Sequence, residues 1–227
     1  MKGTLYGLGV GPGDPELMTL KAIRILSEQE YIAVPSNTPS ESVAYRIALT
    51  AYPDLEKKNL LALPMPMSHN KETLKKSHEA AAEKIEQILD SGYSVVFLTL
   101  GDPSIYSTFG YVQKIVTSRG YPTEYISGIP SFCAVAAKMN LPLSLWSEEI
   151  HIIPGIHTIN TLPETGTCII MKSGKNLPLV KKMLKTTGRD AFMVENCGME
   201  NEQIYEHLDN LPDSSGYFSL IISPSPS

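Results

Sequence analysis

The segment TLYGLGVGPGDP, residues 4–15, decides the fold. It starts as a short run of apolar residues, continues into a glycine-rich loop and ends on Asp14-Pro15. Asp is a favoured N-cap residue and Pro a favoured first residue of a helix, so the segment predicts a strand that passes through a tight loop into a helix. In α/β proteins such a loop is a common place for a ligand. The Asp-Pro pair by itself needs no ligand to explain it.

The same alternation of apolar runs and helical periodicity continues through the first half of the chain, which predicts a mainly parallel sheet covered by helices on both faces. We expect Gly92 and Gly120 to end two of the helices. The predicted strands are residues 4–10, 31–35, 60–64, 94–100 and 123–126, and the predicted helices are residues 15–27, 41–51, 72–91 and 104–119.

The second half predicts another α/β unit with a mixed sheet of its own. A helix is expected at residues 131–139, and strands are expected at residues 150–153, 168–172, 191–195 and 217–222. The chain is therefore predicted to form two α/β domains, residues 1–118 and 119–227. Because no low-complexity linker separates them, we expect the domains to be closely joined with a cleft between them.

Composition narrows the possible partners and location. The formal net charge of -5 and the sequence pI of about 5.6 disfavour nucleic acid as a partner. No apolar run is long enough to span a membrane and no signal-peptide core follows Met1, so the cytoplasm is the predicted location. The cysteines Cys133, Cys168 and Cys197 form no CxxC pair and are expected to be reduced, buried, small apolar side chains. The histidines lack metal-ligand spacing, and no metal site is expected.

Three loops are candidates for ligand binding. The first fails the dinucleotide pattern GxGxxG in every register, because the last glycine is replaced by Pro12, Asp14 or Glu16. The second loop, Gly101-Asp102-Pro103, repeats the Gly-Asp-Pro chemistry of the first after another apolar strand. An aspartate at a helix start would repel a phosphate, so a cationic or neutral polar ligand is favoured. The third loop, residues 127–132 (SGIPSF), has small residues that let backbone amides approach a ligand.

At these residues the chain resembles the tetrapyrrole (precorrin) methylases, whose motifs occur in the order GPGD, GDP and a PG-type turn. The resemblance covers nearly the whole chain and narrows to the branch that methylates carbon C20 of precorrin-2 or its cobalt-loaded counterpart. Two departures are the GIPS sequence of the third turn and the SPSPS ending. The segments that carry the resemblance to this branch are GPGDPEL (11–17), GDPSIYST (101–108), GIPSF (128–132), IIPG (152–155), MK (171–172), VENCGM (194–199) and YFSLII (217–222).

The resemblance implies that S-adenosylmethionine is the cofactor, that it lies in the cleft between the domains and that the protein is a homodimer acting on a tetrapyrrole. Asp102 is the candidate catalytic base, although a role in helix capping or cofactor positioning is the preferred reading. Tyr106 would share a helix face with Asp102 if the helix began at the turn. Met171 is expected in the core of a strand in any case. The implied cofactor-binding residues are Pro12, Leu100, Gly101, Asp102, Ile105, Tyr106, Ser131, Phe132, Met171, Tyr217, Phe218 and Ser219.

The carboxylates of such a substrate would require local cations on this acidic protein. The basic stretch of residues 69–78, with its Lys75 and Lys76, could supply them together with Lys21 and Arg24, although a solvated helix face explains the stretch better. Alternative functions are methylation of another corrin-precursor carbon, a diphthine synthase or ribosomal RNA ribose methylase activity, and non-catalytic binding of a small molecule.

Overall fold

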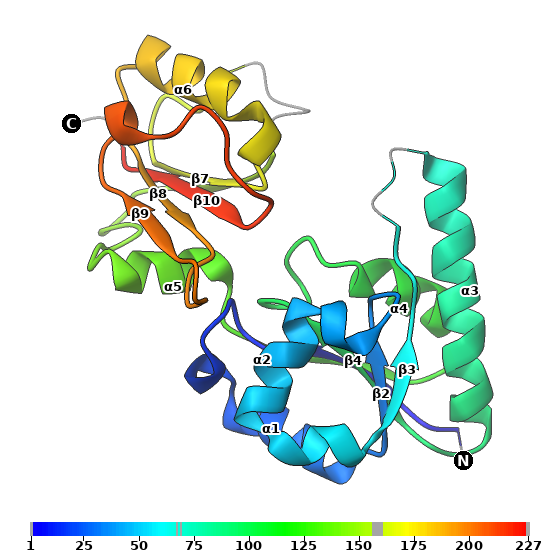
Figure 1. The fold of residues 1–227 in the computed structure, drawn as a ribbon. Coiled ribbons are helices and arrows are strands. Elements are labelled where there is room, and N and C mark those ends of the chain that lie inside the picture. Colours follow the sequence, from blue (N-terminus) through cyan, green and yellow to red (C-terminus); the bar gives the residue numbers. More distant parts are fainter. Residues whose placement is uncertain (1, 67, 69, 156–160, 226–227) are drawn as a thin grey trace. The chain divides into compact units, whose positions relative to one another are not determined.

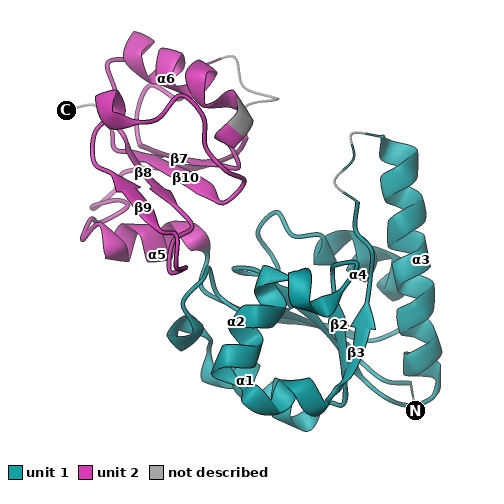
Figure 2. Cartoon of the chain, in the orientation of Figure 1, with its two compact units in different colours: residues 1–130 teal, residues 131–227 magenta. Residues whose placement is uncertain are grey.

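The computed structural model describes residues 2–66, 68, 70–155 and 161–225. The chain divides into two compact units, Met1–Pro130 and Ser131–Ser227 (Figure 2). Each unit has its own five-stranded sheet. The expected fold class of two α/β domains is therefore confirmed.

All strand pairs of the first sheet are parallel. Its order is β3 (Asn59–Ala62), β2 (Tyr31–Val34), β4 (Val95–Thr99), β1 (Leu5–Gly9) and β5 (Thr123–Ile126). Because the strands are parallel, the loops that leave their carboxyl ends all emerge at one edge of the sheet. The three loops predicted to bind a ligand follow β1, β4 and β5, which are neighbours at the centre and side of the sheet.

Helices cover both faces of this sheet (Figure 1). The helices α1 (Leu20–Glu28) and α2 (Val43–Ala51) share one apolar core with Val96 and Leu98 of β4. On the other face, α3 (Lys71–Asp90) and α4 (Phe109–Ser118) share a second core with Val95 and Phe97. Successive residues of β4 thus serve opposite faces, which explains why the strand is apolar throughout. Three short 3-10 helices complete the unit: η1 (Pro15–Leu17), η2 (Pro39–Glu41) and η3 (Pro53–Lys57).

The second sheet is mixed, with the order β6 (Ile150–Pro154), β7 (Thr167–Met171), β10 (Ser219–Ser223), β8 (Phe192–Glu195) and β9 (Gln203–Tyr205). Only β6 and β7 pair in parallel. The helix α6 (Leu177–Thr186) follows η5 (Gly174–Asn176) and packs on a core that includes Cys168, Ile170 and Ile221. The helix α5 (Ser131–Lys138) contacts β10, and η6 (Leu208–Asn210) follows β9. Among the described residues, no helix combines the length and apolarity needed to cross a membrane.

Several predicted boundaries differ from the structure. The division between the units falls after Pro130 rather than after residue 118, because β5 pairs with β1 in the first sheet. The helix expected at residues 15–27 is split into η1 and α1, with Thr19 capping α1 through Ala22 N–H. Sequence periodicity missed α6 and the short β9. Gly92 and Gly120 do follow the ends of α3 and α4, with φ of 86° and 80°, as predicted.

Candidate functional site

The three predicted loops touch one another through their backbones. Gly101 N–H donates to Gly11 O at 2.7 Å, and Gly11 N–H donates to Gly101 O at 3.3 Å, so the loops after β1 and β4 form a short bridge. Both glycines have positive φ, 79° and 72°, a conformation that is costly for other residues. The first two candidate loops are therefore in direct contact.

Two further glycines allow the third loop to join. A Cβ atom on Gly9 would overlap Gly101 O and lie 2.7 Å from Gly128 N, and a Cβ atom on Gly128 would overlap Gly101 O and lie 2.9 Å from Gly9 Cα. These are backbone contacts, which cannot move aside as a flexible side chain could. We call Gly9, Gly11, Gly101 and Gly128 the glycine junction. At this junction, the loops that follow the carboxyl ends of β1, β4 and β5 pack closely against one another through their backbones.

Asp102 fastens this junction. Its side chain is buried, with 9% of the residue exposed. Its Oδ1 atom accepts a hydrogen bond from Ser104 N–H at 2.8 Å and another from the Ser104 hydroxyl, while Oδ2 accepts from Gly128 N–H at 3.0 Å. Each carboxylate oxygen therefore already holds a partner, and the carboxylate joins the loop after β4 to the loop after β5. This geometry supports positioning rather than proton abstraction as the role of Asp102.

Tyr106 does not lie on a helix with Asp102, contrary to the expectation. The α4 helix begins only at Phe109, whose N–H donates to the Ser107 hydroxyl at 3.0 Å, so the segment between Asp102 and Ser107 is a loop. Tyr106 has a φ of 46°, an uncommon value for a residue with a side chain, and 47% of it is exposed. The loop thus presents the tyrosine to solvent. Of its neighbours, Leu100 and Ile105 are partly buried, and Pro12 in the first loop is buried.

The other predicted cofactor residues belong to the second unit. Ser131 and Phe132 open α5, and Phe132 is buried. Met171 ends β7, where it pairs with Leu220 of β10. The segment from Tyr217 to Ser219 leads into β10, and the rings of Tyr217 and Phe218 meet edge to face at 5.2 Å.

Sequence reasoning named Ser219 in this segment but missed Ser173 and Ser215. Ser173 is fully buried and Ser219 is 3% exposed, and neither hydroxyl has a hydrogen-bond partner among the described residues; the buried Ser215 hydroxyl also lacks one. A buried hydroxyl without a partner costs free energy, which a bound polar ligand or water would recover. Gly174 makes the approach possible, because a Cβ atom there would overlap the backbone oxygens of Ser215 and Gly216. The signal in the sequence would have been the paired Ser-Gly dipeptides.

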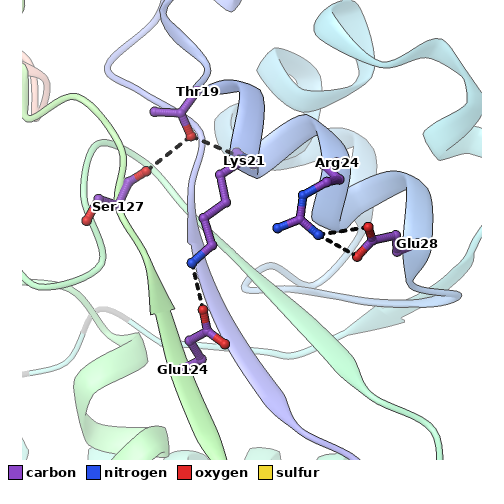
Figure 3. Close-up of polar contacts among 7 residues, drawn as sticks. Thr19, Lys21, Arg24, Glu28, Glu124 and Ser127 are labelled. Atoms are coloured by element: carbon purple, nitrogen blue, oxygen red, sulfur yellow. Dashed lines mark hydrogen bonds and ion pairs between the residues drawn. The ribbon is translucent and has the colours of Figure 1, made fainter.

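The cations predicted to meet the substrate are engaged in ion pairs. Figure 3 shows Lys21 bound to Glu124 at 2.7 Å and Arg24 bound to both oxygens of Glu28 at 2.8 Å and 3.0 Å. The same view shows the Thr19 hydroxyl donating to Ser127 O at 3.4 Å, which ties the start of α1 to the third loop. The charges of Lys21 and Arg24 are therefore already paired with glutamates of the protein itself.

Residues 71–78 of the basic stretch form the start of α3, where Lys71, Lys75 and Lys76 are exposed. Lys75 lies 3.8 Å from Glu79, and Lys76 lies 2.9 Å from Glu72, both at the i, i+4 spacing that solvated helices favour. His78, by contrast, is buried, and burial lowers its pKa. His69 lies outside the described residues. The arrangement supports the solvated helix face over a substrate patch.

The cysteines have different environments. All three are free thiols, and only Cys168 is buried as expected; Cys133 is exposed and Cys197 is half-buried. Burial raises the pKa of the Cys168 thiol. Within the part of the chain that the structure describes, no group of three or more acidic, histidine or cysteine side chains could hold a metal ion.

Comparisons with known proteins agree with the motifs. The family model of the tetrapyrrole (corrin/porphyrin) methylases matches residues 4–212. A protein named "probable cobalt-precorrin-2 C(20)-methyltransferase" from Methanocaldococcus jannaschii is 39% identical over 96% of this chain and 94% of its own length. A precorrin-2 C(20)-methyltransferase from Sinorhizobium sp. is 29% identical over 98% of this chain and 95% of its own length.

Among solved structures, uroporphyrin-III C-methyltransferase from Thermus thermophilus, complexed with S-adenyl homocysteine, shares the fold. Its TM-score is 0.68 at 21% identity, and the match covers 97% of this chain and 97% of that one. The family match spans most of the chain and includes all three loops of the glycine junction. The chain belongs to the tetrapyrrole methylases.

Proposed function

We propose that this protein transfers a methyl group from S-adenosylmethionine to carbon C20 of precorrin-2, or of its cobalt-loaded counterpart, in corrin synthesis. The observation that carries the proposal is the 39% identity to a probable cobalt-precorrin-2 C(20)-methyltransferase over nearly the full length of both chains. The precorrin-2 enzyme from Sinorhizobium sp. supports the same position on the ring.

The residues present fit the proposed cofactor. The glycine junction packs the backbones of the three loops against one another, and this contact fixes the loops that would hold the amino-acid moiety of the cofactor. In the second unit, the hydroxyls of Ser173 and Ser219 are buried and unpaired among the described residues, as expected of groups that await a polar ligand. The Thermus thermophilus relative with S-adenyl homocysteine supports the choice of cofactor.

We assign the residues to two groups. Residues of the first unit would hold the amino-acid and sulfonium part of the cofactor, with Asp102 shaping the loops around it. Residues of the second unit would hold the adenosine. The first group is Pro12, Leu100, Gly101, Asp102, Ile105 and Tyr106, and the second is Ser131, Phe132, Met171, Tyr217, Phe218 and Ser219, to which we add Ser173.

The chemistry requires little from acidic or basic side chains. When bound, the cofactor supplies an electrophilic methyl group and leaves as a neutral thioether, so C20 forms a bond to carbon as the carbon–sulfur bond breaks. Holding two reactants in line can lower the activation free energy by about 7–11 kcal/mol. The fixed loops of the junction, rather than a reactive side chain, would provide this alignment. The ring would then release the C20 proton to solvent water rather than to Asp102, because both Asp102 oxygens already accept hydrogen bonds.

The proposal is tested by incubating the purified protein with cofactor labelled with ¹³C in the methyl group and with either precorrin-2 or cobalt-factor II. We expect S-adenosylhomocysteine to be released and the labelled methyl to appear at C20 by NMR. A methyl at another carbon would assign the protein to a different corrin methylase. Tight cofactor binding without release of S-adenosylhomocysteine would indicate a binding protein instead.

We also propose that the enzyme is a cytoplasmic homodimer and that neither nucleic acid nor membrane is a partner. The family resemblance supports the dimer, and the acidic charge supports the exclusion of nucleic acid. Light scattering of the purified protein should give twice the chain mass of 24.9 kDa. A monomer mass across the micromolar range would contradict the dimer.

A further inference from the structure

We propose that Arg46 binds a carboxylate of the tetrapyrrole substrate and thereby orients the macrocycle. The inference rests on the proposed function, since it takes the substrate to be a ring with acidic side chains. It replaces the cations that the sequence suggested, which are paired with acidic residues of the protein itself.

The position of Arg46 follows from the parallel sheet. Every helix that follows a strand of this sheet starts at the edge where the glycine junction lies, so cations in the first turns of these helices are placed at that edge. In α1 to α4 there are three such cations, Lys21, Arg46 and Lys71, and the first turn of α4 has none. Lys21 is bound to Glu124, which leaves Arg46 and Lys71.

The contacts of α2 and of the Arg46 side chain place this residue on the β2–β3 side of the edge where the strands end. Its helix, α2, packs against η1, the 3-10 helix that the GPGDP loop enters. One guanidinium nitrogen donates to Ser40 O in η2 at 3.0 Å, so the side chain folds back over the loop after β2. The η2 helix in turn contacts β3, the neighbouring strand. The guanidinium therefore lies beside the connection that leaves the carboxyl end of β2, and β2 is the neighbour of β4, whose loop carries Asp102.

Arg46 differs from the other arginines in its hydrogen-bond and ion-pair partners. Arg24 and Arg119 each bind both oxygens of a glutamate, Glu28 and Glu86. Arg189 is buried and donates to the carbonyl oxygens of Pro163, Gly166 and Pro224.

Arg46 is exposed, and among the described residues its only partner is the Ser40 carbonyl. Glu41 lies in the adjacent η2 but forms no ion pair with it among these residues. An arginine whose fork is largely unoccupied can bind a carboxylate with two parallel hydrogen bonds. In a chain of net charge -5, such a cation at the edge where the strands end is the group that an acidic ring would meet.

The experiment compares Arg46→Gln with Arg24→Gln. The control removes another exposed arginine from the same unit, but one that Glu28 already neutralises. Precorrin-2 is titrated anaerobically into each protein in the presence of S-adenosylhomocysteine, and the affinity for S-adenosylhomocysteine alone is measured by calorimetry. We expect Arg46→Gln to weaken precorrin-2 binding about tenfold or more, as loss of a charge-assisted hydrogen bond would, with unchanged cofactor-product affinity. Arg24→Gln should match the wild type.

Two further readouts separate a specific contact from loss of structure. Arg46→Lys keeps the charge but loses the fork and should recover part of the affinity. The ratio between wild type and Arg46→Gln should shrink as salt is raised, because an exposed ion pair is screened over about 8 Å at physiological ionic strength. Lys71→Gln tests whether the second cation contributes as well.

The possible results separate the proposed role of Arg46 from the proposed methyltransferase function. Equal precorrin-2 affinity in wild type, Arg46→Gln and Arg24→Gln would overturn the role of Arg46 while leaving the methyltransferase proposal intact. A wild type that binds neither precorrin-2 nor cobalt-factor II in the same titration would overturn both. An equal loss in Arg46→Gln and Arg24→Gln would show a general charge effect and would also reject the specific contact.

Discussion

At the scale of single residues, the Asp102 carboxylate joins two loops through its hydrogen bonds to Ser104 and Gly128. The residue type and its place after a strand suggest a helix cap or a base. The structure shows instead that the carboxylate connects the loop after β4 to Gly128, in the loop after β5. A backbone N–H that is buried at a loop crossing needs an acceptor, and Asp102 supplies it. Its connecting role depends on a partner 26 residues away.

We predict that Asp102→Asn lowers both stability and cofactor affinity. Whichever way the amide is oriented, its NH₂ group faces either Gly128 N–H or Ser104 N–H, and one of these donors loses its acceptor. The expected loss in free energy of unfolding is about 1–3 kcal/mol, measured by urea titration. Calorimetry should show weaker binding of S-adenosylhomocysteine as well.

The matched control is Asp14→Asn in the first loop. Asp14 accepts one hydrogen bond from Glu16 N–H as the cap of η1, and Asn caps a helix about as well as Asp. This variant should unfold at nearly the wild-type urea concentration. If Asp102→Asn kept wild-type stability and cofactor affinity but lost turnover, Asp102 would be the base after all.

At the scale of elements, α3 and α4 pack side by side on one face of the first sheet, and His78 belongs to their interface. Its ring stacks on Tyr111 of α4 with centroids 4.9 Å apart and planes at 8°. Only 9% of His78 is exposed, and burial holds its pKa below the ordinary value of 6.5. The helix pair therefore prefers the neutral imidazole.

We predict that this interface weakens in acid. When the folded-state pKa of a histidine is below its unfolded-state pKa, the unfolded chain binds more protons, so stability falls as the pH drops through the unfolded value near 6.5 toward the folded one. Urea unfolding of His78→Gln between pH 7.5 and 5.5 should show a shallower decline than the wild type. If the free energy of unfolding fell equally with pH in His78→Gln and in the wild type, the role of His78 would be contradicted.

His207 has the opposite effect from His78 on the pH dependence of stability. Its Nδ1 atom lies 3.0 Å from Asp190 Oδ2, and this pairing raises its pKa. The stability that His207 contributes is fully present below its unfolded pKa and is lost as the pH rises through the raised folded value. His207→Gln should therefore make the decline toward acid steeper, opposite to His78→Gln.

At the scale of the whole molecule, each unit contains its own apolar cores. Every buried member of the two cores on either side of the first sheet lies before residue 127, and every member of the core beside α6 lies after residue 152. Among the described residues, none of these three core clusters combines residues of both units. This arrangement has a consequence for truncated chains.

We predict that the fragment of residues 1–130 folds by itself, with a cooperative urea transition measured by circular dichroism. The fragment of residues 1–118 should be markedly less stable, because it lacks β5, exposes the edge of β1 and removes the Gly128 partner of Asp102. Equal stability of the two fragments would place the domain boundary at residue 118, where the sequence alone put it.

The sequence by itself determined the strands of the first sheet, the glycines that end α3 and α4, and the family, but it missed α6 and β9. These features depend on local chemistry: apolar β4, glycines after α3 and α4, and the ordered motifs from Gly11 to Ile222. It placed the start of α4 too early, because the Asp-Pro signal after β4 serves a loop rather than the first turn of a helix.

Only the tertiary structure decided which distant groups meet. It paired Asp102 with Gly128, Lys21 with Glu124, and Thr123–Ile126 with β1, and it left the hydroxyls of Ser173 and Ser219 without partners among the described residues. It also left Arg46 without an acidic partner there while Lys21 and Arg24 have theirs. These contacts depend on the order of strands in the sheet, which joins residues far apart in the chain and which no local pattern encodes.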